Sequence, residues 1–287
     1  MIKIEHLTHT YQSEQGKNIA LNNLSLEINE GEHLAVLGQN GCGKSTLAKH
    51  LNALLLPDKG TVTIDGMDST DENSLWQIRQ KVGMVFQNPD NQLVATTVEE
   101  DCAFGPENLG LEPAIIRERV DEALAMVEMT AFKNKAPHLL SGGQKQRVTI
   151  AGIIAMRPKY IVFDEPTAML DPQGHREVIQ TMQKLNKEEH ITIINITHYM
   201  EEAADADYVI VIDDGLIAAK GTPEQLKEEY SKDRLVLTAA ETEALKKALA
   251  GREYFVRADR IEVPLTRTLD ALPVLDACFE RYFAGCG

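Results

Sequence analysis

The chain has 287 residues and carries 44 acidic against 29 basic side chains, which gives a net charge of -15. This acidic balance disfavours non-specific binding to the phosphate backbone of nucleic acid, so we expect no nucleic-acid partner. The longest apolar stretches, such as residues 150–156, fall short of the ~18 to 20 residues that a membrane span requires. The first residues lack the apolar core of a secretory signal, and we therefore expect the chain to stay in the cytosol.

The N-terminal part alternates between apolar and polar residues, as strands do, at 2–7, 19–28, 33–38 and 60–66. The strand at 33–38 runs into a glycine-rich turn, and an apolar-periodic segment at 45–56 follows and ends before Pro57. A strand, a glycine-rich loop and a helix in this order are typical of a nucleotide-binding loop.

The middle of the chain turns helical and charged from about 106 to 137, and we interpret residues 88–158 as a helical insertion. Two apolar runs, at 160–165 and 191–198, look like buried parallel strands separated by a helix at 174–188. A strand at 209–215 and a segment at 218–223 close the sheet, and Pro223 marks a plausible domain boundary. In the remaining tail, 224–287, the segments 224–230 and 239–250 are helical in pattern, whereas 254–263 could be a strand.

The motif GQNGCGKST fills the glycine-rich turn and matches the phosphate-binding consensus G-x-x-x-x-G-K-[ST]. Its glycines leave backbone N–H groups free to surround phosphate oxygens, and the helix N-terminus adds its positive dipole end. Lys44 would reach the β- and γ-phosphates and Ser45 would ligate Mg²⁺. The nucleotide-binding residues of this motif are Gly38, Gln39, Asn40, Gly41, Cys42, Gly43, Lys44, Ser45 and Thr46.

The strand at 160–165 ends in two carboxylates, Asp164 and Glu165. Asp164 would lie at the carboxyl edge of the sheet, where it can hold Mg²⁺. Glu165 faces the same crevice one residue later and can polarise a water molecule, so it is the candidate general base. The sequence thus predicts that ATP and Mg²⁺ bind at this edge of the sheet.

A second anion site is indicated by LSGGQKQR at 140–147. Ser141 can cap the helix that follows, and Gly142 and Gly143 leave backbone N–H groups open beside Gln144. An ATP molecule that is already bound by a complete phosphate loop has little use for a second helix N-terminus from the same subunit. We therefore expect this site to serve the nucleotide of a partner subunit.

Because they contain LSGGQ together with the motifs above, residues 1–223 resemble the ATP-binding cassette (ABC) ATPases. The resemblance implies an α/β P-loop fold with a mixed core sheet, an N-terminal antiparallel subdomain, the helical subdomain at 88–158 and a small C-terminal extension. It also implies that two cassettes pair head to tail around ATP. By motif order it assigns adenine stacking to Tyr11, a Mg²⁺ and water contact to Gln87, a contact across the dimer interface to Asp171, and a γ-phosphate contact to His198.

Several stretches, including residues 86–101, 103–110, 164–172 and 196–207, are similar to the ATPases of energy-coupling factor (ECF) transporters, and most similar to the first of two paralogous forms. These transporters import vitamins or metal ions across the membrane. The resemblance therefore implies that this chain lies peripherally on the cytoplasmic face of the membrane. It also implies a second ATPase, a transmembrane scaffold contacted through the segment from Asp90 to Thr97, and an indirectly bound substrate-binding membrane subunit. Because that subunit selects the cargo, the transported substrate is not readable from this chain.

Three alternatives stay open. A conventional ABC transporter subunit is the nearest, followed by a soluble cassette ATPase acting on nucleic acid or ribosomes and by a nucleotide-gated module without catalysis. The sequence leaves open whether the ATPase pair is a homodimer or a heterodimer. The extension at 224–287 would contact the second ATPase.

The four cysteines lack paired spacing, which favours reduced thiols over a disulfide or zinc framework. One of them, Cys42, stands where the resembled family usually has Ser or Ala. A thiol beside the nucleotide would be open to oxidation or alkylation.

Overall fold

The computed structural model describes residues 1–13, 16–230, 233–238, 246, 249, 254–257 and 260–265. The chain forms two compact units, Met1–Pro223 and Glu224–Gly287. Within the described parts of the chain, no helix combines the length and the apolar character needed to cross a membrane.

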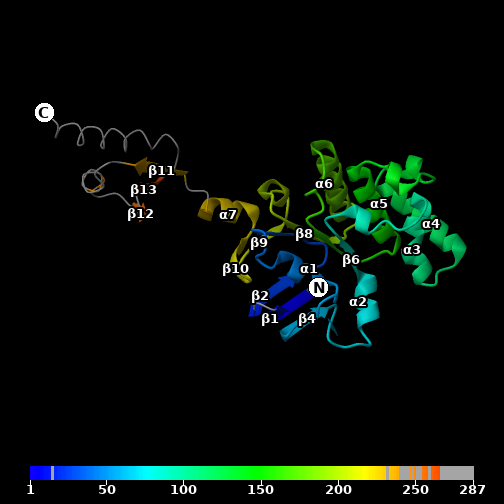
Figure 1. Cartoon of the computed structure of the whole chain (residues 1–287), viewed down its shortest axis with the longest axis horizontal. Coiled ribbons are helices and arrows are strands. Elements are labelled where there is room, and N and C mark those ends of the chain that lie inside the picture. The colour runs from blue at the N-terminus through cyan, green and yellow to red at the C-terminus, as the bar shows by residue number, and fades with distance from the viewer. Residues whose placement is uncertain are drawn as a thin grey trace. The chain divides into compact units, whose positions relative to one another are not determined.

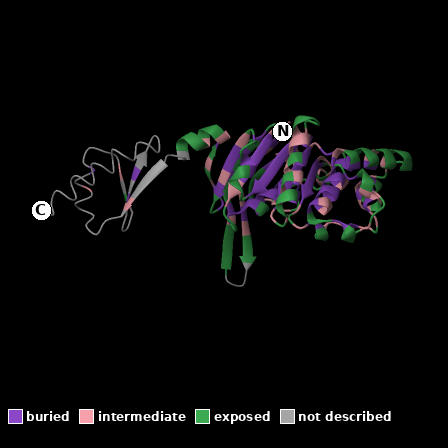
Figure 2. Ribbon diagram, turned by 90° about the horizontal axis from the view of Figure 1, so that it is seen from above, coloured by how far each residue is buried: buried purple, intermediate pink, exposed green. Residues whose placement is uncertain are grey.

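The core of the first unit is a six-stranded sheet (Figure 1). Its spatial order is β10 (Leu216–Gly221), β9 (Tyr208–Asp213), β3 (His33–Gly38), β8 (Thr192–Thr197), β7 (Tyr160–Asp164) and β6 (Val82–Val85). The strands from β9 to β6 run parallel, and β10 pairs antiparallel to β9. Every residue of β7 and β8 is buried, as their continuous apolar runs predicted. Figure 2 shows buried strands in purple at the centre of the first unit.

A four-stranded antiparallel sheet contains β2 (Gly16–Ile28), β1 (Ile2–Ser13), β4 (Lys59–Ile64) and β5 (Met67–Asp68), in that order. Helix α1 (Lys44–Leu51) packs Leu47 and Leu51 in one apolar cluster with Ile2 of this sheet and Val36 of the core sheet. The helix ends earlier than the predicted 56, because Ala53 already has a left-handed φ of 54°. The antiparallel subdomain and the mixed core predicted from the sequence are both confirmed.

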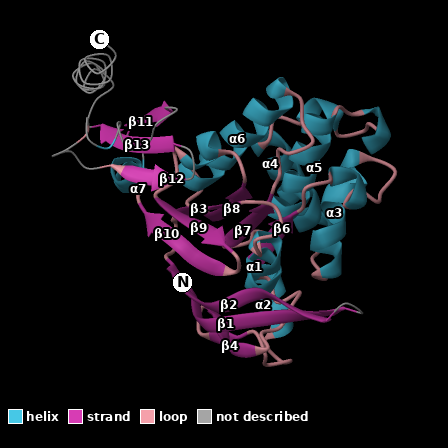
Figure 3. Ribbon diagram, turned by 60° about the vertical axis from the view of Figure 1, so that its left-hand side comes forward, coloured by secondary structure: helices cyan, strands magenta, loops and turns pink. Residues whose placement is uncertain are grey.

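The opposite face of the core sheet is covered by helices (Figures 1 and 3). Helices α5 (Gly142–Ala155) and α6 (Pro172–Lys187) pack on strands of this sheet, whereas α3 (Val98–Asn108) and α4 (Pro113–Met126) pack against α5. Along β7, Ile161 and Phe163 face these helices whereas Val162 faces α1, as the period of two in a strand requires. Helix α3 begins before the predicted 106, because Thr97 and Glu100 form a capping box there.

Among the helices and strands of the first unit, α2 (Leu75–Lys81), the two-residue β5, and β6, which follows α2 without a turn, were not predicted. Short 3₁₀ turns complete the unit: η1 (Pro89–Asn91), η2 (Thr130–Phe132), η3 (Pro137–Leu139) and η4 (Met200–Ala203).

The second unit continues from α7 (Pro223–Tyr230) and contains an antiparallel sheet in the order β11 (Asp233–Thr238), β13 (Arg260–Leu265), β12 (Phe255–Arg257). The helix expected at 224–230 and strand structure within 254–263 are therefore confirmed. The helix expected at 239–250 lies outside the described residues, apart from positions 246 and 249.

Candidate functional site

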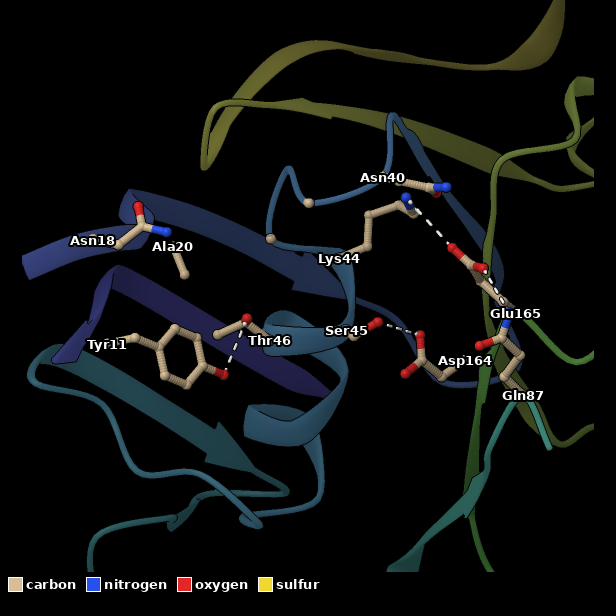
Figure 4. Close-up of a pocket in the computed structure, with 12 residues that line it drawn as sticks. Tyr11, Asn18, Ala20, Asn40, Lys44, Ser45, Thr46, Gln87, Asp164 and Glu165 are labelled. Carbon is tan, nitrogen blue, oxygen red and sulfur yellow. Dashed lines mark hydrogen bonds and ion pairs between the residues drawn. The ribbon is translucent and has the colours of Figure 1, made fainter. Parts of the chain in front are cut away.

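A pocket of about 470 Å³ lies where the loop after β3 and the start of α1 meet the antiparallel sheet (Figure 4). Its lining consists of Tyr11, Asn18, Ala20, Asn40, Gly41, Gly43, Lys44, Ser45, Thr46, Gln87, Asp164 and Glu165. All of these except Asn18 and Ala20 were predicted as site residues from the sequence. The structure therefore gathers residues that are far apart in the chain into one cavity.

The phosphate loop is shaped by backbone contacts that only glycine permits. Gly43 has a φ of 110°, and a Cβ there would lie 2.3 Å from the carbonyl oxygen of Ala20. Lys44 follows and is only 4% exposed, and its ammonium donates to the carbonyls of Gly38 and Gln39, both at 2.9 Å. The lysine charge is thus held in place by its own loop, at the start of a helix whose free N–H groups favour anions.

Ser45 and Asp164 form the part of the pocket that suits a cation. The Ser45 hydroxyl donates to Asp164 Oδ1 at 2.9 Å (Figure 4). Burial raises the pKa of Asp164 above its ordinary value, and the hydrogen bond from Ser45 opposes that rise. A hydroxyl and a buried carboxylate side by side are oxygen ligands of the kind that Mg²⁺ prefers, so these residues fit the predicted ion.

Three predicted side chains approach Glu165 from different segments of the chain. Lys44 Nζ lies 3.6 Å from its Oε1, while Gln87 Nε2 and His198 Nδ1 lie 3.4 and 3.6 Å from its Oε2. Glu165 has a left-handed φ of 51°, and its N–H donates to the Ile196 carbonyl at 2.9 Å. This unfavourable backbone conformation is held by its surroundings and aims the carboxylate at the pocket.

The wall formed by the antiparallel sheet contains Tyr11, which is 41% exposed and whose hydroxyl lies 3.3 Å from Thr46 Oγ1. Asn18 pairs with Tyr11 across the β1–β2 ladder, and Ala20 contacts the phosphate loop at Gly43. Sequence reasoning missed Asn18 and Ala20. No motif marks them, because strand register alone brings them to the pocket.

The second predicted anion site lies outside this pocket, at the starts of α5 and α6. Ser141 Oγ accepts from the Gln144 N–H at 3.3 Å, and Gln144 Oε1 accepts from the Ser141 N–H at 3.0 Å. Asp171 caps α6 by accepting from the Gly174 N–H at 2.9 Å. The predicted residues Ser141, Gly142, Gly143, Gln144 and Asp171 are all absent from the pocket lining.

The segment after Gln87 differs from expectation at two side chains, because Leu93 packs against the apolar cluster of the helices and Gln92 turns inward. Gln92 was expected to face a membrane partner, yet its Oε1 accepts from the Phe86 N–H at 2.8 Å and its Nε2 donates to the Met84 carbonyl at 3.2 Å. Gln92 therefore stabilises the end of β6, which Gln87 follows. Val94, further along the segment, is 70% exposed.

A groove of about 310 Å³ lies between α2, α3 and α5, with Gln92 at its lining. Trp76 and Phe104 line it and are 57% and 56% exposed, and Met156 contributes further apolar surface. Exposed large apolar side chains that share one groove are typical of a protein contact surface.

Cys42 departs from the expected reactivity. Its side chain is buried against the phosphate loop, and burial raises the pKa of the thiol above its ordinary value. The thiol therefore stays protonated at neutral pH and is a poor nucleophile.

Comparison with known proteins places this geometry in a family. Residues 21–168 match the ABC transporter family. The chain is 60% identical to the energy-coupling factor transporter ATP-binding protein EcfA1 of Clostridium novyi over 79% of this chain and 81% of that protein. It is 56% identical to the protein of the same name in Clostridioides difficile, over 82% and 84% of the two chains.

Two solved structures are also similar. One is cbiO1 from Clostridium perfringens, part of the ABC transporter complex cbiONQ, with a TM-score of 0.73 and 37% identity over 87% of this chain and 94% of that chain. The other is a dimeric ATP-binding cassette in a post-hydrolysis state bound to ADP and phosphate, with a TM-score of 0.70 and 33% identity over 78% and 99%. The chain belongs to the ABC transporter family of ATPases and, within it, to the energy-coupling factor transporter ATP-binding proteins.

Proposed function

We propose that the chain hydrolyses ATP in the pocket of Figure 4, with Glu165 as the general base. The observation that carries the proposal is the approach of Lys44, Gln87 and His198 to this one carboxylate, within 3.4 to 3.6 Å. Glu165 would accept a proton from the attacking water while Gln87 orients that water and His198 contacts the γ-phosphate. Lys44 would hold the β- and γ-phosphates, and adenine would stack on Tyr11.

We propose that Ser45, Asp164 and Gln87 hold Mg²⁺ when ATP is bound. Bound there, the ion would neutralise phosphate charge. The observation that supports this assignment is the 2.9 Å hydrogen bond between Ser45 and Asp164, which already gathers two oxygen ligands at the phosphate loop.

The second part of the proposal is a head-to-tail pair of ATPases. The starts of α5 and α6 present Ser141, Gly142, Gly143 and Asp171 away from the pocket of their own chain. We propose that these residues close over the nucleotide of the second ATPase. What supports this is that Ser141 and Gly142 are exposed at the N-terminus of α5, and a helix N-terminus favours a phosphate anion.

The third part concerns the membrane. We propose that the groove between α2, α3 and α5, together with the exposed part of residues 90–97, receives a transmembrane scaffold subunit. The exposed rings of Trp76 and Phe104 support this, because an apolar helix would cover them. The substrate, a vitamin or a metal ion, would be selected by a separate membrane subunit, and this chain would act at the cytoplasmic face.

We further propose that residues 1–223 form the catalytic cassette, with the helical subdomain at 88–158, and that 224–287 contacts the second ATPase. The support for the last assignment is that Glu224–Gly287 forms a compact unit of its own.

Purification from membranes tests the transporter type. We expect the tagged full chain to bring down a second cassette ATPase and a multi-span scaffold, and the substitution Phe104→Asp to release the scaffold without lowering basal ATPase activity. A matched exposed control is Ile115→Asp on α4, which is 41% exposed and absent from the groove lining. Recovery with a dedicated pair of substrate permeases would instead favour a conventional ABC transporter, the alternative that the cassette fold leaves open.

A further inference from the structure

A buried carboxylate outside the pocket, that of Glu202, joins three segments of the cassette. Its side chain is 1% exposed. The Thr167 hydroxyl donates to Oε1, Asn195 Nδ2 donates to Oε2 at 3.2 Å, and His175 Nε2 lies 3.4 Å from Oε1. A buried carboxylate is costly unless it is hydrogen-bonded or paired, so these contacts hold Glu202 and its partners in one arrangement.

The three partners belong to different parts of the fold. Thr167 immediately precedes residues 168–171, the segment predicted to cross the dimer interface. Asn195 lies on β8, the strand that ends just before His198. His175 lies in the first turns of α6. Glu202 itself belongs to η4, which begins two residues after His198.

The segment that carries Glu202 is also packed against His198. The rings of His198 and Tyr199 are 4.1 Å apart, and the Tyr199 ring meets that of His175 edge-on at 5.7 Å. His198 in turn lies 3.6 Å from Glu165. A continuous set of contacts therefore runs from the nucleotide pocket through η4 to the start of α6.

From α6 the contacts continue to the second anion site. Asp171 caps α6 through the Gly174 N–H. Gly174 packs so closely on Gly143 that a Cβ on Gly143 would lie 2.6 Å from the Cα of Gly174. The starts of α5 and α6 therefore meet through their backbones, and a shift of one start displaces the other because packed interiors are nearly incompressible.

We propose that Glu202 is a positioning residue for ATP hydrolysis, which fixes the segment after His198 to residues 167–171. Through this link, contact of His198 with the γ-phosphate in one site sets the position of Asp171 and Ser141 at the nucleotide of the partner. This inference rests on the proposed function. Glu202 touches neither nucleotide and acts through Thr167, Asn195 and His175.

The test compares matched variants of the full chain, assembled with its partner ATPase if it requires one. Glu202→Met and Thr167→Val each remove the hydrogen bond between these residues, and we expect kcat to fall by about 10- to 100-fold. KM for ATP should stay near the wild-type value, because neither residue lines the pocket. Thr167→Ser keeps the hydroxyl and should restore kcat, and Glu201→Gln, at an exposed neighbour, should leave it unchanged.

The double variant Glu202→Met/Thr167→Val should be no slower than the slower single variant, since Glu202→Met already lacks the interaction that Thr167→Val removes. Circular dichroism and thermal unfolding establish that each variant is folded, and Thr167→Val carries the test if Glu202→Met does not fold. Wild-type kcat in the folded variants would overturn the positioning role. So would equal losses for Thr167→Ser and Thr167→Val, or losses that multiply in the double variant.

The outcome is separable from that of the proposed function. If the wild type hydrolyses ATP and Glu165→Gln stops it, the assignment of the site stands whatever the Glu202 variants do. The kinetics of the Glu202 and Thr167 variants then test only the positioning role.

Discussion

Replacing Gln92 by methionine should slow ATP hydrolysis, although Gln92 does not touch the phosphate loop. Methionine has a similar length but can neither accept from the Phe86 N–H nor donate to the Met84 carbonyl, so the hydrogen bonds of 2.8 and 3.2 Å are lost. Each backbone group left without its partner costs about 1 to 3 kcal/mol when buried. Because Gln92 is half-buried, water can replace part of the lost hydrogen bonding. We therefore expect a total free-energy cost of about 1 to 3 kcal/mol.

The lost hydrogen bonds destabilise the end of β6, which positions Gln87, one residue after Phe86. If all of it raised the activation barrier, kcat would fall by about 5- to 150-fold, since ~1.4 kcal/mol corresponds to a factor of ten. The assay is steady-state ATP hydrolysis by the purified chain, with thermal unfolding measured in parallel. Asn91→Ala is the control, because Asn91 is the exposed neighbour on the same turn. A wild-type kcat in Gln92→Met, or an equal loss in Asn91→Ala, would refute the reasoning.

Three further predictions concern the phosphate loop and the second anion site. Lys44→Ala should weaken ATP binding measured by calorimetry, and unchanged affinity would count against the phosphate contact of this lysine. Gly143→Ala should destabilise the fold by about 1 to 3 kcal/mol in denaturant unfolding, because the new methyl group meets Gly174 at 2.6 Å; unaltered stability would mean that the starts of α5 and α6 separate freely. Iodoacetamide at pH 8 should leave Cys42 unmodified in the native protein and label it after unfolding, as mapped by mass spectrometry. Rapid labelling of the native protein would contradict the burial and raised pKa of this thiol.

The parts of the site that could be predicted from sequence are those in which short-range order determines geometry. Gly38 to Thr46 form a loop between a strand and a helix, so the motif already implies the positions of Lys44 and Ser45. Asp164 and Glu165 end a buried strand, and parallel strands bring their carboxyl ends to one edge. The cap formed by Ser141 and Gln144 is likewise local, because both partners lie within one helical turn.

The parts that could not be predicted depend on pairing between distant segments. Asn18 reaches the pocket only through the register of β1 and β2, and Glu202 finds Thr167 only after β7 and β8 have paired. Gln92 lies in a polar, turn-rich segment that indicates exposure, but the unpaired backbone groups at the end of β6 draw its side chain inward. Helix α2 was missed because a seven-residue helix with one buried residue, Ile78, shows too little periodicity.

The central claim is that Glu165 is the base that turns a bound ATP into ADP and phosphate. The most direct measurement is single-turnover hydrolysis by Glu165→Gln, with ATP affinity determined on the same preparation. We expect ATP binding to persist, the closed ATPase dimer to accumulate, and the hydrolysis rate to fall by about 10² to 10⁴. Hydrolysis at the wild-type rate by this variant would contradict the account.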